Sequence, residues 1–130
     1  MRTLILAVIV FAFQNHALPV TAPQISDLVG NWTGTSLCQV RPSPCHDEDV
    51  VFRFSKPHED KITVQADKIV DGKAVTMGAS EWTYQKSNQT LTWEMPRGIW
   101  KVIVNGDTID GTLVVPDSVV FRKIHLKKSK

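Results

Sequence analysis

The sequence has no strong bias of charge. Its 15 basic and 13 acidic residues leave a formal net charge of +2, and loss of the N-terminal segment containing Arg2 would lower this by one unit, to +1. A surplus this small argues against a nucleic-acid partner and against electrostatic attachment to a membrane. The basic cluster at residues 127–130 is interpreted as a solvated tail.

Signatures of catalysis and of cofactor binding are also missing. The chain has no Gly-x-Ser-x-Gly turn, no glycine-rich phosphate loop and no metal-ligand spacing on a helix. We therefore expect a protein that is not an enzyme and holds no cofactor or metal. The acidic run from His46 to Asp49, with Glu59 and Asp60, is interpreted as solvated loops, because adjacent residues cannot all face one ion.

No apolar run is long enough to cross a membrane as a helix. Leu4 to Phe13 is an uninterrupted apolar run, but it has about half of the roughly 20 residues that a spanning helix needs. Together with Arg2 before it, and Ala17 or Ala22 after it, this run is typical of a signal peptide. We expect residues 1–22 to be removed, with cleavage after Ala17 or Ala22, leaving a secreted or periplasmic protein without stable membrane insertion.

Cysteine is scarce, because Cys38 and Cys45 are the only two in the chain. In an exported protein an even count at short spacing indicates one disulfide bond. A metal-binding cysteine pair is the less favoured alternative, because no second pair completes a zinc site.

Helical periodicity is limited to one predicted turn at residues 25–29, with Ser26 or Asp27 as its cap. From Asn31 onward the hydrophobic period is two, and Asp71-Gly72 and Asn105-Gly106 predict two-residue hairpins with type I′ turns. The predicted strands cover residues 31–38, 48–55, 61–70, 73–86, 90–95, 99–104, 107–115 and 118–126.

An even number of strands can close into an antiparallel barrel, so 73–86 is taken as one strand kinked at Gly78. We predict an all-β fold: a small eight-stranded up-and-down antiparallel β-barrel over residues 23–126, preceded by the short helical turn. Closure would also remove strand edges that promote aggregation.

Alternation of side chains along each strand predicts which residues face the interior. The inward set comprises Trp32, Gly34, Ser36, Val50, Phe52, Phe54, Ile62, Val64, Ala66, Val75, Met77, Trp82, Tyr84, Leu91, Trp93, Met95, Trp100, Val102, Val104, Ile109, Gly111, Leu113 and Val115. In the last strand Arg122 shares a face with Val120, Ile124 and Leu126. An inward guanidinium needs a partner, and we predict that it stacks on Trp32 and donates to nearby carbonyl oxygens.

Gly30, Trp32 and Arg122 resemble the closure motif of the lipocalin-like barrels of the calycin superfamily. These barrels open with Gly-x-Trp after a helical turn and close with an arginine or lysine over the tryptophan. The resemblance implies binding rather than catalysis, with structural roles for all three residues. The chain is shorter than the larger lipocalins, shows no C-terminal helix, and is nearer in size to avidins and small inhibitor barrels.

The aromatic interior is the first place to expect a ligand, because small-molecule sites are apolar with few polar groups. The candidate ligand-binding residues are Phe52, Phe54, Trp82, Tyr84, Trp93 and Trp100; the alternative is that they form a packed core.

The sequence is compatible with three functions. The first is a secreted or periplasmic binding protein for a small, mostly apolar ligand. The second is a disulfide-containing inhibitor of a protease or lysozyme, acting on an extracytoplasmic protein through its N-terminal segment or rim loops. A reaction at the barrel rim is third, with Arg97, His46 and Asp47 as the residues to mutate first.

Overall fold

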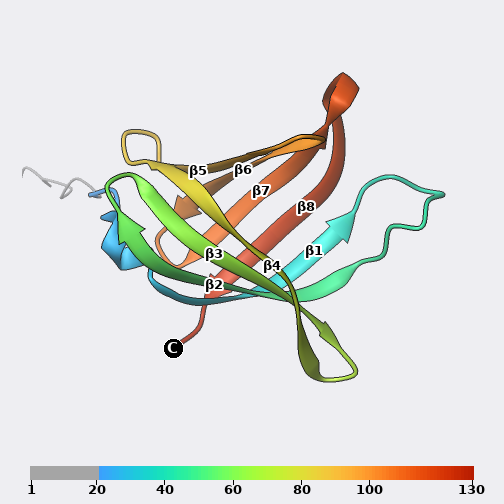
Figure 1. Ribbon diagram of the computed structural model, residues 1–130, viewed down its shortest axis with the longest axis horizontal. Coiled ribbons are helices and arrows are strands. Elements are labelled where there is room, and N and C mark those ends of the chain that lie inside the picture. Colours follow the sequence, from blue (N-terminus) through green and yellow to red (C-terminus); the bar gives the residue numbers. More distant parts are fainter. Residues whose placement is uncertain (1–20) are drawn as a thin grey trace, which may run out of the picture.

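The computed structural model describes residues 21–130, which form a closed barrel of eight antiparallel strands in up-and-down order (Figure 1). Most of the predicted signal peptide, including the cleavage site at Ala17, lies outside the described residues. The predicted barrel and the short helical turn before it are confirmed.

Two short 3-10 helices accompany the strands: η1 (Ile25–Leu28) precedes β1, and η2 (Pro116–Ser118) joins β7 to β8. The strands are β1 (Gly30–Cys38), β2 (Glu48–His58), β3 (Lys61–Val70), β4 (Lys73–Gln85), β5 (Thr90–Met95), β6 (Gly98–Asn105), β7 (Thr108–Val115) and β8 (Val119–Lys128). Each neighbouring pair is antiparallel, and β8 returns to pair with β1.

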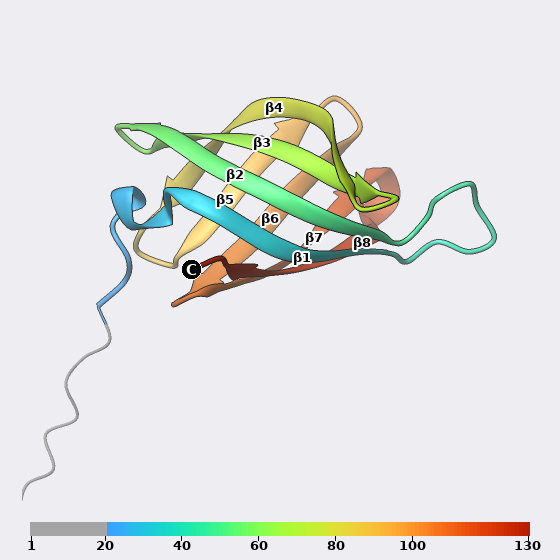
Figure 2. The same ribbon diagram turned by 90° about the horizontal axis from the view of Figure 1, so that it is seen from below.

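The two ends of the barrel differ. Figure 2 shows η1 at one end and the long β1–β2 loop projecting from the other. At the first end, which we call the closed end, Leu28 of η1 is buried against the core. At the second end, which we call the open end, the β1–β2 loop is joined by the β3–β4, β5–β6 and β7–β8 connections, because antiparallel strands alternate in direction.

The core is built from the inward face of each strand, as the period of two predicts. Its largest fully buried side chains include two tryptophans, Trp32 and Trp82. The remaining core residues are Leu28, Val50, Phe52, Phe54, Ile62, Val64, Tyr84, Leu91, Trp100, Val102, Val104, Ile109, Leu113, Ile124 and Leu126.

Two local predictions are corrected. Gln24, not Ser26 or Asp27, is the N-cap of η1, and its backbone N–H donates to the Asp27 carboxylate at 2.8 Å. The β6–β7 hairpin turns at Gly106-Asp107, since Asn105 pairs with Thr108. Only Gly106 of these two has positive φ (62°), the pattern of a type II′ turn. The type I′ prediction is correct at Asp71-Gly72, where both φ angles are positive.

The kink in β4 arises at a bulge beside Gly78, whose φ of 150° is unfavourable for residues with a Cβ. Gly78 pairs with Ala66 and Thr76 with Asp67, so Met77 is the extra residue. Beyond the bulge, the β3–β4 hairpin projects past its neighbours (Figure 1). Val75 and Met77, predicted to face the interior, are therefore 44% and 47% exposed.

A second bulge changes the inward face of β8. Arg122 pairs with Leu113 and Val120 with Val114, leaving Phe121 as the extra residue. The alternation therefore reverses: Phe121 packs against the core and Val120, predicted to face inward, is exposed. At its other end β8 continues to Lys128, so half of the predicted basic tail belongs to the barrel.

Trp32 is covered by Lys128 and not by Arg122. The two residues are partners in the β1–β8 register, and the Lys128 Nζ lies 5.7 Å from the centre of the Trp32 ring. Lys128 Nζ also donates to the backbone oxygen of Asp27 at 2.5 Å. The Trp32 Nε1–H donates to the Leu28 oxygen at 2.9 Å, so this cluster joins η1, β1 and β8.

Arg122 lies at the open end, where it pairs with Cys38 in the β1–β8 register. Its guanidinium donates to the backbone oxygens of Ser36 and His46 and to the Ser36 hydroxyl, at 3.1–3.3 Å. Glu48 lies 3.8 Å away. The prediction that Arg122 donates to carbonyl oxygens is correct, whereas its stacking on Trp32 is wrong, because the strand register separates them by six residues.

We predict that Trp32 and Lys128 are energetically coupled. In a double-mutant cycle on Trp32→Leu and Lys128→Ala, the coupling free energy should be about 0.5–1 kcal/mol, the contribution of an exposed cation over an indole face. Urea unfolding of the four proteins measures it. The same cycle with Arg122→Ala is the control and should give no coupling; coupling to Arg122 alone would contradict the assignment.

Candidate functional site

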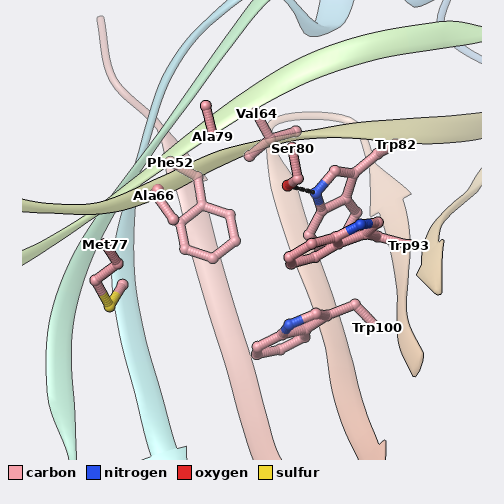
Figure 3. Close-up of a pocket in the computed structure, with 10 residues that line it drawn as sticks. Phe52, Val64, Ala66, Met77, Ala79, Ser80, Trp82, Trp93 and Trp100 are labelled. Atoms are coloured by element: carbon pink, nitrogen blue, oxygen red, sulfur yellow. Dashed lines mark hydrogen bonds between the residues drawn. The ribbon is translucent and has the colours of Figure 1, made fainter. Parts of the chain in front are cut away.

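An apolar cavity of about 260 Å³ lies inside the barrel, between β4 and the strands around it (Figure 3). Three of the chain's four tryptophans contribute to its wall. Its lining residues are Phe52, Val64, Ala66, Met77, Gly78, Ala79, Ser80, Trp82, Trp93 and Trp100. We call this cavity the tryptophan pocket.

The pocket forms beside the two neighbouring strands that share the fewest backbone pairs. β4 pairs with β5 only from Thr83 to Gln85, and the two strands diverge from their connecting turn (Figure 1). Trp93 therefore pairs only with Trp100 of β6. On the β4 side, Gly78 and Ala79 place little side-chain volume against the space. Divergence of the strands and small residues together leave the cavity unfilled.

The indole rings are arranged around Trp82. Its ring centre is 6.0 Å from that of Trp93 and 6.2 Å from that of Trp100, with interplanar angles of 31° and 32°. Phe52 meets Trp82 edge to face at 6.3 Å. Trp82 Nε1–H donates to the Ser80 hydroxyl at 2.8 Å. Figure 3 shows the three indoles one above another, with Ser80 beside Trp82.

Four of the six predicted ligand-binding residues line the pocket: Phe52, Trp82, Trp93 and Trp100. The other two lie elsewhere in the core. Phe54 packs edge to face on Trp32, at 6.0 Å. Tyr84 donates its hydroxyl to the Pro23 oxygen at 2.7 Å, and burial, with a smaller contribution from the Asp27 charge, raises the pKa of Tyr84.

The small residues of the pocket wall were not assigned to the site from the sequence. Gly78, Ala79 and Ser80 indicated only a kink in the strand. The run of three small residues in a strand facing several tryptophans was the available signal, because small inward side chains leave space beside large ones.

A polar cluster on the outer face holds the bulge that shapes the pocket. The Asp67 carboxylate accepts hydrogen bonds from Arg53 Nε at 2.9 Å and from Gln65 Nε2 at 3.1 Å. Burial alone would raise the pKa of Asp67, but its hydrogen bonds with Arg53, Gln65 and Thr76 outweigh burial and lower it. Since Thr76 is the register partner of Asp67, the charged carboxylate joins β2, β3 and β4 beside the bulge.

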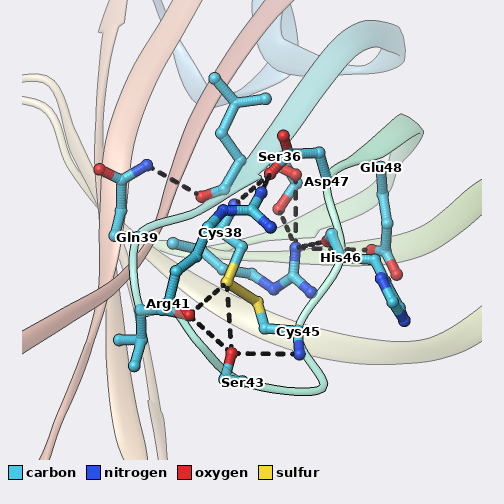
Figure 4. The surroundings of a disulfide bond; sticks show 12 residues. Ser36, Cys38, Gln39, Arg41, Ser43, Cys45, His46, Asp47 and Glu48 are labelled. Atoms are coloured by element: carbon cyan, nitrogen blue, oxygen red, sulfur yellow. Dashed lines mark hydrogen bonds and ion pairs between the residues drawn. A yellow bond between two sulfur atoms is a disulfide. The ribbon is translucent and has the colours of Figure 1, made fainter.

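The predicted disulfide joins Cys38 to Cys45 at the base of the β1–β2 loop (Figure 4). Inside the loop the Ser43 hydroxyl donates to the Val40 oxygen at 2.6 Å. Asp47 accepts from the Cys38 backbone N–H at 2.8 Å and from Arg41 at 2.9 Å. The loop is therefore braced at its base by a covalent bond and by hydrogen bonds from both sides.

Two carboxylates of the acidic run after Cys45 make structural contacts. Asp47 is paired with Arg41, and Glu48 lies near Arg122. Within residues 21–130, no group of three or more His, Cys, Asp or Glu side chains is placed to hold a metal ion. Arg97 of the β5–β6 turn and this loop are at the same end of the barrel.

Comparison with protein-family models, with curated proteins and with solved structures gave no match for this chain. Among residues 21–130 no helix has the length and apolar character needed to cross a membrane.

We predict that Asp67→Asn lowers the free energy of unfolding by about 1–3 kcal/mol at pH 7, because it removes hydrogen bonds to a charged, buried group. The folded-state pKa of Asp67 is below its unfolded value of about 3.9. The stabilisation is thus present above that unfolded value and is lost as pH falls through the folded pKa. Urea unfolding from neutral to acidic pH measures it, and a pH-independent difference between wild type and variant would contradict it.

Proposed function

We propose that this chain is a lipocalin-like binding protein that takes a small, mostly apolar ligand into the tryptophan pocket. The observation that supports this best is a cavity of about 260 Å³ walled by three indoles and a phenyl ring. Apolar walls with a few polar groups are typical of small-molecule sites. Membership of the calycin superfamily belongs to the same proposal, supported by the strand order and by a cation over Trp32.

The volume limits the size of the ligand. Pockets for drug-sized molecules measure about 300–1,000 Å³, whereas an engineered apolar cavity of about 150 Å³ in another protein binds benzene. At about 260 Å³ the tryptophan pocket falls between these. One or two fused rings, or a short branched chain, would fill it.

The proposed place of action is the periplasm or the extracellular space. A disulfide bond is typical of oxidising compartments, and Cys38–Cys45 forms one. The signal-like character of residues 1–22 supports export.

Naphthalene is the probe for binding of an apolar ligand in the pocket. In a titration followed by NMR, the indole N–H resonances of Trp93 and Trp100 should shift, because both rings line the pocket. The resonance of Trp32 should stay in place, since its N–H is bonded to Leu28 at the closed end.

Ala66→Leu should weaken naphthalene binding at least about tenfold by filling the cavity, because close-packed interiors have no room for a ligand. The matched control is Ala74→Leu, the same change at an exposed position of β4 outside the pocket; its affinity should equal that of wild type. Absence of any shift in the wild-type protein would contradict the proposal.

A second candidate function is inhibition of a protease or lysozyme by the β1–β2 loop. Its supporting observation is that the loop projects from the open end (Figure 2) while being braced at its base by Cys38–Cys45 and by Asp47. Preorganised loops lose little conformational entropy on binding. The N-terminal segment is less suited to this role, because Leu28 is buried and Pro23 is bonded to Tyr84.

Inhibition assays against a lysozyme and a trypsin-like protease test this second candidate. The wild-type chain should inhibit one of them. The paired change Cys38→Ser and Cys45→Ser should weaken inhibition at least about tenfold, because it frees the loop. Ala66→Leu, which changes only the pocket, should leave inhibition unchanged. If both enzymes stay fully active in an excess of the wild-type protein, the inhibitor function is contradicted.

A further inference from the structure

The three indole N–H groups around the tryptophan pocket differ in their hydrogen bonds. The N–H of Trp82 is bonded to the Ser80 hydroxyl at 2.8 Å. Within the described part of the chain, the N–H groups of Trp93 and Trp100 donate to no protein acceptor, and no fully buried side-chain nitrogen lacks a partner, so both N–H groups are reached by solvent. A ligand that displaces this solvent from the pocket has to replace its hydrogen bonds.

The side chains of the pocket wall supply hydrogen-bond donors. None of its lining side chains is a carboxylate or an amide. The Ser80 oxygen already accepts from Trp82, so the Ser80 proton is available as a further donor. A ligand with a hydrogen-bond acceptor therefore satisfies groups that a hydrocarbon leaves unpaired.

The shape of the wall favours a flat ligand. The planes of Trp93 and Trp100 are each tilted by only about 30° from that of Trp82. Phe52 stands nearly perpendicular, with an interplanar angle of 73°. Offset stacking on indoles and an edge contact with a phenyl ring are the arrangements that aromatic ligands prefer.

We propose that the ligand of the tryptophan pocket is a planar molecule of one or two rings whose ring nitrogen or ring carbonyl accepts a hydrogen bond from the indole N–H of Trp100. This inference rests on the proposed small-molecule function and narrows its ligand class. It predicts that ring compounds with an acceptor bind more tightly than hydrocarbons of equal size, and that flat molecules bind more tightly than flexible chains.

Quinoline and naphthalene form the matched pair of probes, because they have the same two-ring shape and differ by one ring nitrogen. Both are uncharged at neutral pH. Calorimetric titration should give quinoline the higher affinity by about 2- to 10-fold, the net effect of one hydrogen bond. In the NMR titration quinoline should move the Trp100 indole proton downfield by accepting its hydrogen bond, whereas naphthalene should shift it only through the ring current, without that downfield change.

Trp100→Phe keeps an aromatic ring and removes the donor, so quinoline and naphthalene should then bind equally. Trp82→Phe is the control: its N–H is already bonded to Ser80, so the preference for quinoline should persist. The Trp32 indole resonance reports whether each variant is folded. If Trp100→Phe does not fold, the quinoline-induced shift of the Trp100 indole proton in the wild-type protein still tests the inference.

The outcomes separate the two proposals. Equal affinities for the two probes in the wild-type protein, or a quinoline preference that survives Trp100→Phe, would overturn the acceptor inference while leaving the small-molecule function in place. Binding of neither probe would overturn both.

Discussion

Closure of the barrel between β1 and β8 is the constraint on which the rest of the structure depends. A shift of one residue in this register would turn every side chain of a strand to the opposite face. Trp32 and Lys128 meet at the closed end, and Arg122 joins β8 to Ser36 and His46 at the open end. Different contacts at the two ends of the β1–β8 pairing therefore maintain a single register between these strands.

The opposite wall of the barrel is less constrained, and the cavity lies there. β4 has 13 residues and β5 only six, so β4 extends past the end of its neighbour and the two pair only near their turn. The bulge at Met77, held from outside by Asp67 and its partners, bends β4 beside this gap. Unequal strand lengths thus produce a pocket in a barrel otherwise small enough to be filled by side chains.

The closed end and the proposed binding site use different aromatic residues of the core. At the closed end Trp32 is bonded to Leu28 of η1, Phe54 packs on Trp32, and Tyr84 is bonded to Pro23 before η1. Phe52, Trp82, Trp93 and Trp100 surround the cavity. The braced β1–β2 loop is a third region, attached through Arg122 and the disulfide. Substitutions in the pocket, at the closed end and in the loop can therefore be interpreted separately.

The sequence alone determined the number and order of strands, the hairpin at Asp71-Gly72 and the aromatic interior, because alternation and turn chemistry are local properties. Tertiary structure decided which cation covers Trp32. Arg122 and Lys128 share one face of β8 in the sequence, and only the pairing of β8 with β1 places Lys128 opposite Trp32. The exposure of Val120 and the division of the aromatic residues between the closed end and the pocket were also decided there, because the bulge in β8 and the unequal pairing of β4 with β5 leave no local mark in the sequence.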